Sequence, residues 1–165
     1  MFDNRNKRAI LIFPKFKNID KIQTIRNKYD RLANLISPHI TLVFPFSDSV
    51  TNDDLVFKLS NLLSSYSSFK VIFNGISLSH DNYIFLNCTH GKDILITLHD
   101  DIYQTILPTH LKLDIPYIPH ITLGQKNTLS NILLDYTFET LIDEICIEQI
   151  GSNEECNIIK RIKLN

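Results

Sequence analysis

The chain has 165 residues, 44% hydrophobic and 21% charged, which is enough apolar material for one folded domain over residues 1–165. The net charge of −1 argues against sequence-independent coating of nucleic acid, so we expect no stable DNA binding. No apolar run is long enough to span a membrane, and the opening residues lack a secretory pattern. We therefore expect a cytoplasmic protein with no membrane partner.

The first half of the chain alternates strands and helices. An apolar, β-branched run predicts a buried strand over 8–13, and isoleucines at helical spacing predict a helix over 19–29. A second apolar run predicts a strand over 40–46. A Ser or Thr cap, two aspartates and then leucines at helical spacing predict a helix over 51–63.

The rest of the chain adds hairpins. Residues 69–79 and 83–86 predict two strands that turn through Asp81-Asn82. The remaining predicted elements are a helix over 94–106, a strand over 118–124, a short helix over 129–134, and strands over 141–150 and 157–164. Interspersed helices with hairpins favour an α+β fold with largely antiparallel sheets over a doubly wound parallel sheet.

A repeated pentapeptide is the most informative feature of the sequence. Residues 38–42 and 119–123 both read Pro-His-Ile-Thr-Leu, 81 positions apart. Such a pair arises by chance in roughly one chain in fifty of this size and composition. Proline disfavours helix in the residue before it and often opens a strand, so each copy predicts the start of a strand.

Alternation along a strand decides which side chains of the repeat share a face. His39 and Thr41 point one way in the first copy, as do His120 and Thr122 in the second. The Ile and Leu of each copy point to the other face, into a core. If an approximate twofold axis relates the halves, two imidazoles and two hydroxyls meet across a cleft.

That set of groups suits phosphodiester chemistry. One histidine can serve as base and the other as acid, because imidazole titrates near neutrality. Threonine hydroxyls can donate to phosphate oxygens, and a hydrogen bond to a charged group is worth about 1.5–3 kcal/mol. A lone His beside a Thr on a strand is usually structural, so the inference depends on the pair.

A metal site is the alternative reading of the two histidines. Neither motif has a second His or a carboxylate at local ligand spacing, so no metal or other cofactor is expected. Cys88, Cys146 and Cys156 form no CxxC pair, which argues against a cysteine zinc site or a disulfide framework.

These motifs resemble the 2H phosphoesterases, also called the 2′-5′ RNA ligase-like superfamily, and in particular its small bacterial branch. The matching residues are Phe13-Pro14, Arg26 with Tyr29-Asp30, the two pentapeptides, and Gly124-Gln125. The resemblance implies a bilobal α+β fold, with two pseudo-symmetric antiparallel lobes, helices packed outside and a central cleft. It covers most of the chain, from about residue 8 onward.

The resemblance also implies an activity and roles for residues. The expected substrates are cyclic phosphates or 2′-5′ linkages of nucleotides or RNA ends. His120 would act as the base toward water and His39 as the acid toward the leaving ribose oxygen, while Thr41 and Thr122 bind the phosphate. RNA end-joining, as the reverse reaction, and a non-catalytic nucleotide- or RNA-binding protein are the alternatives.

Other residues are weaker candidates for substrate binding. Tyr117 could stack on a base, although aromatic residues at strand ends usually belong to the core. Arg26 could contact substrate or only pair with Asp30. Residues 1–31 carry nine Lys and Arg against three acids, which predicts either a basic rim or a solvated face. No apolar stripe is left over, so we expect a monomer.

Overall fold

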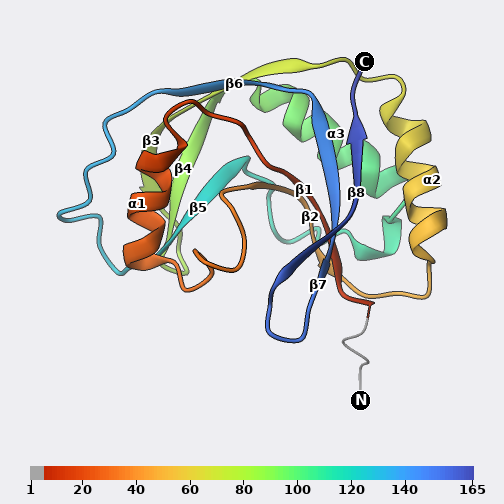
Figure 1. The fold of residues 1–165 in the computed structure, drawn as a ribbon, viewed down its shortest axis with the longest axis horizontal. Coiled ribbons are helices and arrows are strands. Elements are labelled where there is room, and N and C mark those ends of the chain that lie inside the picture. Colours follow the sequence, from red (N-terminus) through yellow and green to blue (C-terminus); the bar gives the residue numbers. More distant parts are fainter. Residues whose placement is uncertain (1–5) are drawn as a thin grey trace.

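The computed structural model describes residues 6–165, which form one sheet flanked by helices (Figure 1). The strands are β1 (Arg8–Ile12), β2 (Ile40–Phe46), β3 (Phe69–Leu78), β4 (Tyr83–His90), β5 (His120–Gln125), β6 (Phe138–Ile142), β7 (Glu144–Ile150) and β8 (Cys156–Lys163). The helices are α1 (Ile19–Tyr29), α2 (Asn52–Leu63), α3 (Lys92–Thr105) and the short 3₁₀ helix η2 (Pro108–His110). Within residues 6–165, no helix has the length and apolarity to cross a membrane.

The sheet consists of two lobes that meet at its centre. Its strand order is β6-β3-β4-β5-β2-β1-β7-β8, and all neighbouring strands are antiparallel. The first four strands form one lobe and the last four form the other. A single antiparallel pair, Ile40 with Ile121, joins β2 to β5. The predicted α+β fold with two antiparallel lobes is confirmed, and the lobes form one continuous, curled sheet (Figure 1).

Two helices cross from one lobe to the other. Helix α1 follows β1 along the chain but packs on β5, and α3 follows β4 but packs on β2. Helix α2 packs beside β8, so α2 and α3 lie together on the side away from α1 (Figure 1). The crossings relate β1-α1-β2 to β4-α3-β5, which agrees with the pseudo-symmetric lobes that the family resemblance implied.

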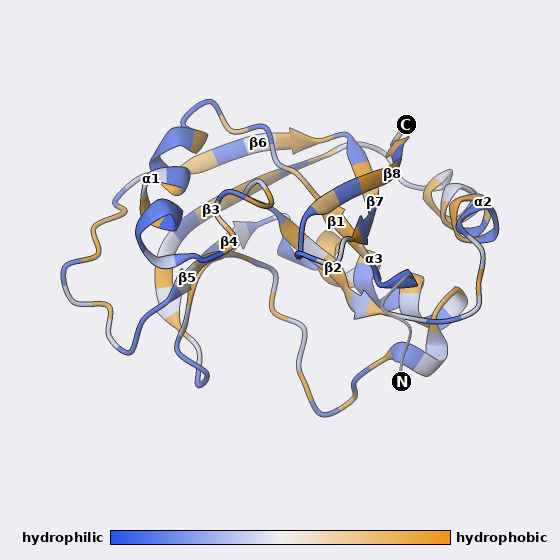
Figure 2. Cartoon of the chain, turned by 60° about the horizontal axis from the view of Figure 1, so that its bottom comes forward, coloured by the Kyte–Doolittle hydropathy of each residue, from blue (hydrophilic) through white to orange (hydrophobic). Residues whose placement is uncertain are grey.

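The main core lies between the helices and one face of the sheet. Ile40, Leu42, Ile121 and Leu123 are all 0% exposed and belong to this core, as strand alternation predicted. Helix α2 contributes its buried leucines and turns its polar residues outward, and Figure 2 shows both kinds of residue around it. Burying the Ile and Leu of each motif leaves its His and Thr on the opposite face.

Two predicted elements differ from the structure. The short helix predicted over 129–134 is wrong: residues 130–131 form a turn and the rest of the segment is irregular. Asn131 adopts the left-handed conformation with φ of 64°, which a right-handed helix does not contain. The single strand predicted over 141–150 is two strands that separate at Asp143. Strand β6 pairs with β3 in one lobe and β7 with β1 in the other, so the break carries the chain between lobes.

Gly124 is required where α1 meets β5. Its φ is 135°, and a Cβ atom there would lie 2.3 Å from the backbone carbonyl carbon and oxygen of Tyr29. We expect Gly124→Ala to destabilise the fold by more than about 3 kcal/mol, because a clash with backbone is added to conformational strain. Gly75 is the matched control: its φ is 79° and its surroundings are open, so Gly75→Ala should cost only about 1–2 kcal/mol. Urea unfolding of both variants gives the comparison, and equal losses would contradict the steric account.

Candidate active site

The two motifs lie side by side at the centre of the sheet. Ile40 pairs with Ile121 in antiparallel register. Moving one residue along each strand in opposite directions places His39 across from Thr122 and Thr41 across from His120. All four side chains leave the sheet on the face away from the main core. The structure therefore brings together the four residues that were predicted from the sequence, and each imidazole faces the hydroxyl of the other motif.

Both imidazole rings are held in the same way. His39 Nδ1 lies 2.9 Å from the carbonyl oxygen of Ser37, and His120 Nδ1 lies 2.6 Å from that of Ile118. A carbonyl oxygen can only accept, so each Nδ1 carries the proton and donates it. In the neutral ring Nε2 is then the free acceptor. The intervening proline of each motif separates the histidine from the carbonyl that orients it.

Aromatic rings support the histidines unequally. His120 stacks on Phe85 of β4, with ring centroids 3.6 Å apart and an interplanar angle of 21°. His39 lies beside Phe13 with a longer centroid distance of 6.1 Å and a tilt of 58°. Sequence reasoning missed Phe85. Alternation along β4 predicts that Phe85 lies on the other face of the strand from the buried Ile84 and Leu86. Only the pairing of β4 with β5 brings its ring against His120.

Burial makes both histidines less basic. Desolvation lowers the pKa of His39 from 6.5 to about 4, and the nearby positive charge of Arg26 contributes, while the Ser37 carbonyl opposes the shift. Desolvation also lowers the pKa of His120, against the opposing effect of the Ile118 carbonyl. Without a ligand both rings are thus neutral at pH 7. Each can accept a proton, and a protonated form requires negative charge in the site.

A cavity of about 530 Å³ opens next to His120 and Thr122. The β3–β4 hairpin, the segment 112–118 and the central strands supply its walls. Its apolar lining includes Phe44, Tyr83, Phe85, Ile115 and Ile118. Ser77 and Lys112 add polar groups. The cavity combines aromatic surfaces with a few polar groups, which is typical of a small-molecule site.

The cleft face beside His39 is filled by protein instead. Ala9, Leu11 and Ile36 form a second apolar cluster on this side of β1, with Phe13 and Cys156 packed against it. The segment that carries Ile36 precedes the first motif and covers this half of the sheet. The site is therefore symmetric in its motifs and asymmetric in its surroundings: the cavity of about 530 Å³ lies on the His120 side, and an apolar cluster packs on the His39 side.

Arg26 lies inside the protein near His39. Its side chain is 1% exposed, Nε donates to Asp30 Oδ2 at 2.8 Å, and Nη1 donates to Gln23 Oε1 at 3.2 Å. Asp30 in turn accepts from the backbone N–H of Leu32. The predicted pairing with Asp30 is confirmed. Arg26 influences the pKa of His39 through its charge, and a direct contact with substrate stays a prediction.

Tyr117 packs against neighbouring residues at the site. Its ring stacks on His99 with centroids 3.9 Å apart, and its hydroxyl donates to the Thr41 carbonyl at 2.9 Å. One face of the ring is thus unavailable to a base. The observed role of Tyr117 is to anchor β2 beside the first motif, and a contact with substrate stays a prediction.

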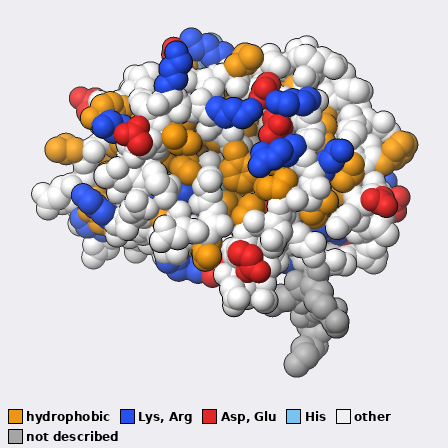
Figure 3. Space-filling view, in the orientation of Figure 1, with side chains coloured by type: hydrophobic (Ala, Val, Ile, Leu, Met, Phe, Trp, Pro, Cys, Tyr) orange, Lys and Arg blue, Asp and Glu red, His pale blue; other side chains and the backbone are white. Residues whose placement is uncertain are grey.

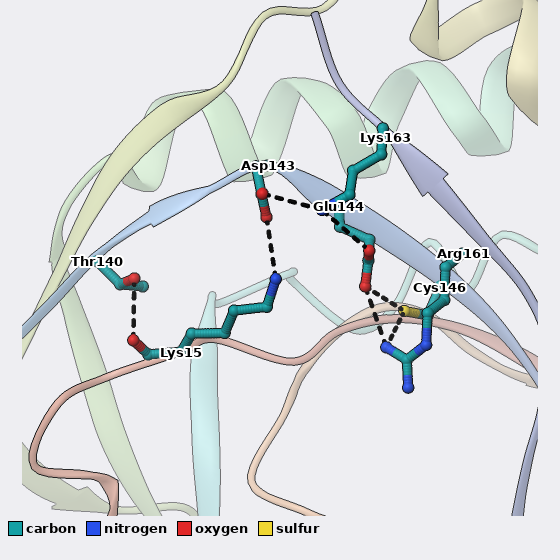
Figure 4. Close-up of polar contacts among 7 residues, drawn as sticks. All are labelled: Lys15, Thr140, Asp143, Glu144, Cys146, Arg161 and Lys163. Atoms are coloured by element: carbon teal, nitrogen blue, oxygen red, sulfur yellow. Dashed lines mark hydrogen bonds and ion pairs between the residues drawn. The ribbon is translucent and has the colours of Figure 1, made fainter.

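Ion pairs neutralise much of the positive charge of residues 6–31, and residues 1–5 of the predicted basic segment lie outside the described residues. Arg8, Lys15, Arg26 and Arg31 each pair with an acidic side chain. Figure 4 shows Lys15 and Lys163 converging on Asp143, and Lys163 and Arg161 on Glu144. On the same face, basic and acidic side chains lie together around apolar ones (Figure 3). This pattern favours a solvated, paired surface over a free basic rim.

No group of three or more His, Cys, Asp or Glu side chains within residues 6–165 is arranged to hold a metal ion. The cysteines are free, with Cys88 and Cys146 buried.

The lowered pKa of His39 predicts how stability depends on pH. The unfolded chain binds this proton near pH 6.5 and the folded chain only near pH 4, so the contribution is complete above pH 6.5 and is lost as pH falls toward 4. Between pH 6.5 and pH 4, the free energy of unfolding of wild type should fall by on the order of 3 kcal/mol more than that of His39→Gln, which lacks the imidazole. Urea unfolding across the range gives the values. His90→Gln, at an exposed histidine, is the control for the substitution itself, and equal slopes for wild type and His39→Gln would contradict the lowered pKa of His39.

A sequence model of the 2′-5′ RNA ligase superfamily matches residues 14–151 of this chain. A Bacillus licheniformis protein, named as a candidate phosphoesterase, is 28% identical over 124 residues, covering 73% of this chain and 71% of its own. A Bacillus cytotoxicus protein with the same designation is 24% identical over 162 residues, covering 92% and 93%.

Solved structures share the fold. The E. coli LigT structure in complex with 3′-AMP matches with a TM-score of 0.76 at 16% identity, covering 97% of this chain and 98% of LigT. A Thermus thermophilus protein matches with a TM-score of 0.71 at 12% identity, covering 96% and 97%. With a matching family model over most of its length and the paired motifs at the centre of its sheet, this chain belongs to the 2′-5′ RNA ligase superfamily, whose members are also called 2H phosphoesterases.

Proposed function

We propose that this protein is a metal-independent phosphoesterase that acts on cyclic phosphates or 2′-5′ phosphodiester linkages of nucleotides or RNA ends. The observation that carries the proposal is the matched geometry of His39 and His120. Each ring donates Nδ1–H to a backbone carbonyl, keeps Nε2 free, and faces a threonine of the other motif. Two such imidazoles supply the base and the acid that phosphoryl transfer needs.

For a 2′,3′-cyclic phosphate the reaction needs one proton taken up and one delivered. Water attacks phosphorus and gives its proton to His120 Nε2 as the new P–O bond forms. Protonated His39 gives its proton to the ribose oxygen as the old P–O bond breaks. Thr41 and Thr122 donate to the non-bridging oxygens. The product is a phosphomonoester, and the two histidines end with their protonation states exchanged.

The lowered pKa values are compatible with both roles. A neutral His120 accepts the proton from water directly. His39 must first be protonated, and the negative charge of a bound phosphate raises its pKa by favouring the charged form. Once protonated, a ring that holds its proton weakly is a strong acid toward a ribose oxygen, which is a poor leaving group.

The cavity beside His120 supports a substrate of nucleotide size. Its aromatic walls suit a planar base, and its volume of about 530 Å³ suits one nucleoside rather than a duplex. The relatives named as candidate phosphoesterases support the reaction class. LigT, whose structures include complexes with 3′-AMP, ATP and NADP⁺, supports a nucleotide ligand for this fold.

Turnover with EDTA present tests the proposal. Wild type should open 2′,3′-cyclic nucleotides or cleave 2′-5′-linked oligonucleotides, and His39→Ala or His120→Ala should each lower kcat at least about 10³-fold. Thr41→Ala and Thr122→Ala should each lower kcat/KM by about 10–150-fold, the value of one hydrogen bond to a charged group. His90→Ala is the control, because that histidine is exposed and ends β4 beyond the residues that pair with β5.

The outcomes separate the candidate functions. Binding of these ligands by wild type without turnover would replace the enzyme with a nucleotide- or RNA-binding protein. Activity that EDTA abolishes would contradict the metal-independent reaction.

A good leaving group distinguishes the acid from the base. A p-nitrophenyl phosphodiester needs no proton on its leaving oxygen, so the variant that lacks the acid should recover most of its loss on this substrate. We expect recovery for His39→Ala and none for His120→Ala. Recovery for His120→Ala alone would reverse the assignment, and the position of the cavity beside His120 makes this reversal the alternative to test.

A further inference from the structure

The strand next to the second motif carries a polar residue directly across from His120. Asn87 of β4 is the register partner of His120 of β5. The adjacent backbone N–H of Cys88 donates to the Pro119 carbonyl, so Cys88 and Pro119 occupy the hydrogen-bonded position. Asn87 and His120 therefore form a non-hydrogen-bonded pair, the kind in which opposing side chains lie closest, with Cα atoms about 4.5 Å apart.

Burial along β4 shows which way Asn87 points. Ile84, Leu86 and Cys88 are buried in the main core. Phe85 and Asn87 are half-buried and lie on the other face. Since Phe85 stacks on His120, Asn87 shares the face that carries the catalytic histidines.

Ser77 holds the Asn87 amide in one orientation. Its hydroxyl lies on β3, lines the cavity, and donates to Asn87 Oδ1 at 3.0 Å. The amide oxygen is thereby engaged, and among residues 6–165 no hydrogen bond from Nδ2 is present. An asparagine amide has two N–H donors, so both stay available to a ligand in the cleft.

The corresponding position beside the first histidine is apolar. Ile12 pairs with Ile40, so the next residue, Phe13, lies across from His39. The ring contact between Phe13 and His39 agrees with this register. The approximate symmetry of the lobes thus breaks at this position, where one histidine has an amide donor and the other has an aromatic ring.

We propose that Asn87 is a further catalytic residue, which donates from Nδ2 to a non-bridging phosphate oxygen beside His120, and that Ser77 is its positioning residue. The proposal rests on the proposed phosphoesterase function and adds a third donor to those of Thr41 and Thr122. A donor already oriented by Ser77 stabilises the charge that develops on the phosphoryl oxygens without reorganising during the reaction.

Substitutions at Asn87 test the donor role. Asn87→Ala should lower kcat by about 10²-fold, as the loss of one oriented donor does elsewhere, with a smaller change in KM. Asn87→Asp keeps the shape and still accepts from Ser77, but presents a negative charge and no donor, so it should lose more activity than Asn87→Ala. An Asn87→Asp variant as active as wild type would overturn the donor role.

Ser77 and a matched asparagine complete the experiment. Ser77→Ala should lower kcat by about tenfold. Ser77→Thr keeps the hydroxyl and should have the kcat of wild type, a recovery that a merely structural role of the side chain would not produce. Asn74→Asp makes the same chemical change in the same hairpin, at an exposed residue that contacts Thr137, and should leave kcat unchanged. Thermal unfolding of each variant shows whether it is folded.

Binding of inorganic phosphate separates this proposal from the proposed function. If wild type turns over no phosphoester, the proposed function fails, and the His120 NMR signal still reports phosphate binding. Asn87→Asp should then bind phosphate at least about tenfold more weakly than wild type and Asn74→Asp. Equal affinity would overturn the role of Asn87, and a wild type that neither turns over phosphoesters nor binds phosphate would overturn both proposals.

Discussion

The rest of the site depends on the single antiparallel pairing between Ile40 and Ile121 at the centre of the sheet. Each isoleucine is fully buried in the core, so the two strands cannot rotate without exposing apolar surface. Their burial fixes both His-x-Thr faces on the opposite side. A contact that is apolar and structural on one face of the sheet therefore sets the distance and register between polar groups on the other.

The crossing helices protect this central pairing. Helix α1 follows a strand of one lobe and packs on β5 of the other, and α3 likewise packs on β2. Each motif strand is therefore packed against a helix that comes from the opposite lobe. Gly124 allows α1 to approach β5 more closely than any side chain would permit. Because few backbone bonds connect β2 with β5, the core beneath them supplies most of the cohesion between lobes.

The surroundings give the two equivalent motifs different properties. Beside His39 the cleft face is filled by an apolar cluster, and the buried Arg26–Asp30 pair lies nearby. Beside His120 there is a cavity, a stacked Phe85 and the Asn87–Ser77 pair. The repeated motif thus provides two similar imidazoles, and the residues around them give one a neighbouring cavity and the other an apolar cover.

The sequence by itself determined most of the strand and helix order, apart from the segments 129–134 and 141–150. It also determined the antiparallel α+β class, the buried Ile and Leu of each motif, and the four His and Thr side chains on the other face. These features depend on local periodicity and on a repeated segment of five residues.

Prediction from the sequence failed where distant contacts decide the structure. The break at Asp143 follows from pairing with strands of different lobes, and burial of Arg26 follows from packing around α1. Only the tertiary structure showed that Tyr117 stacks on His99, that the cavity lies on the His120 side, and that Asn87 faces His120. Each of these results from the register and order of strands, which one strand's own sequence does not specify because its neighbours are chosen by the whole core.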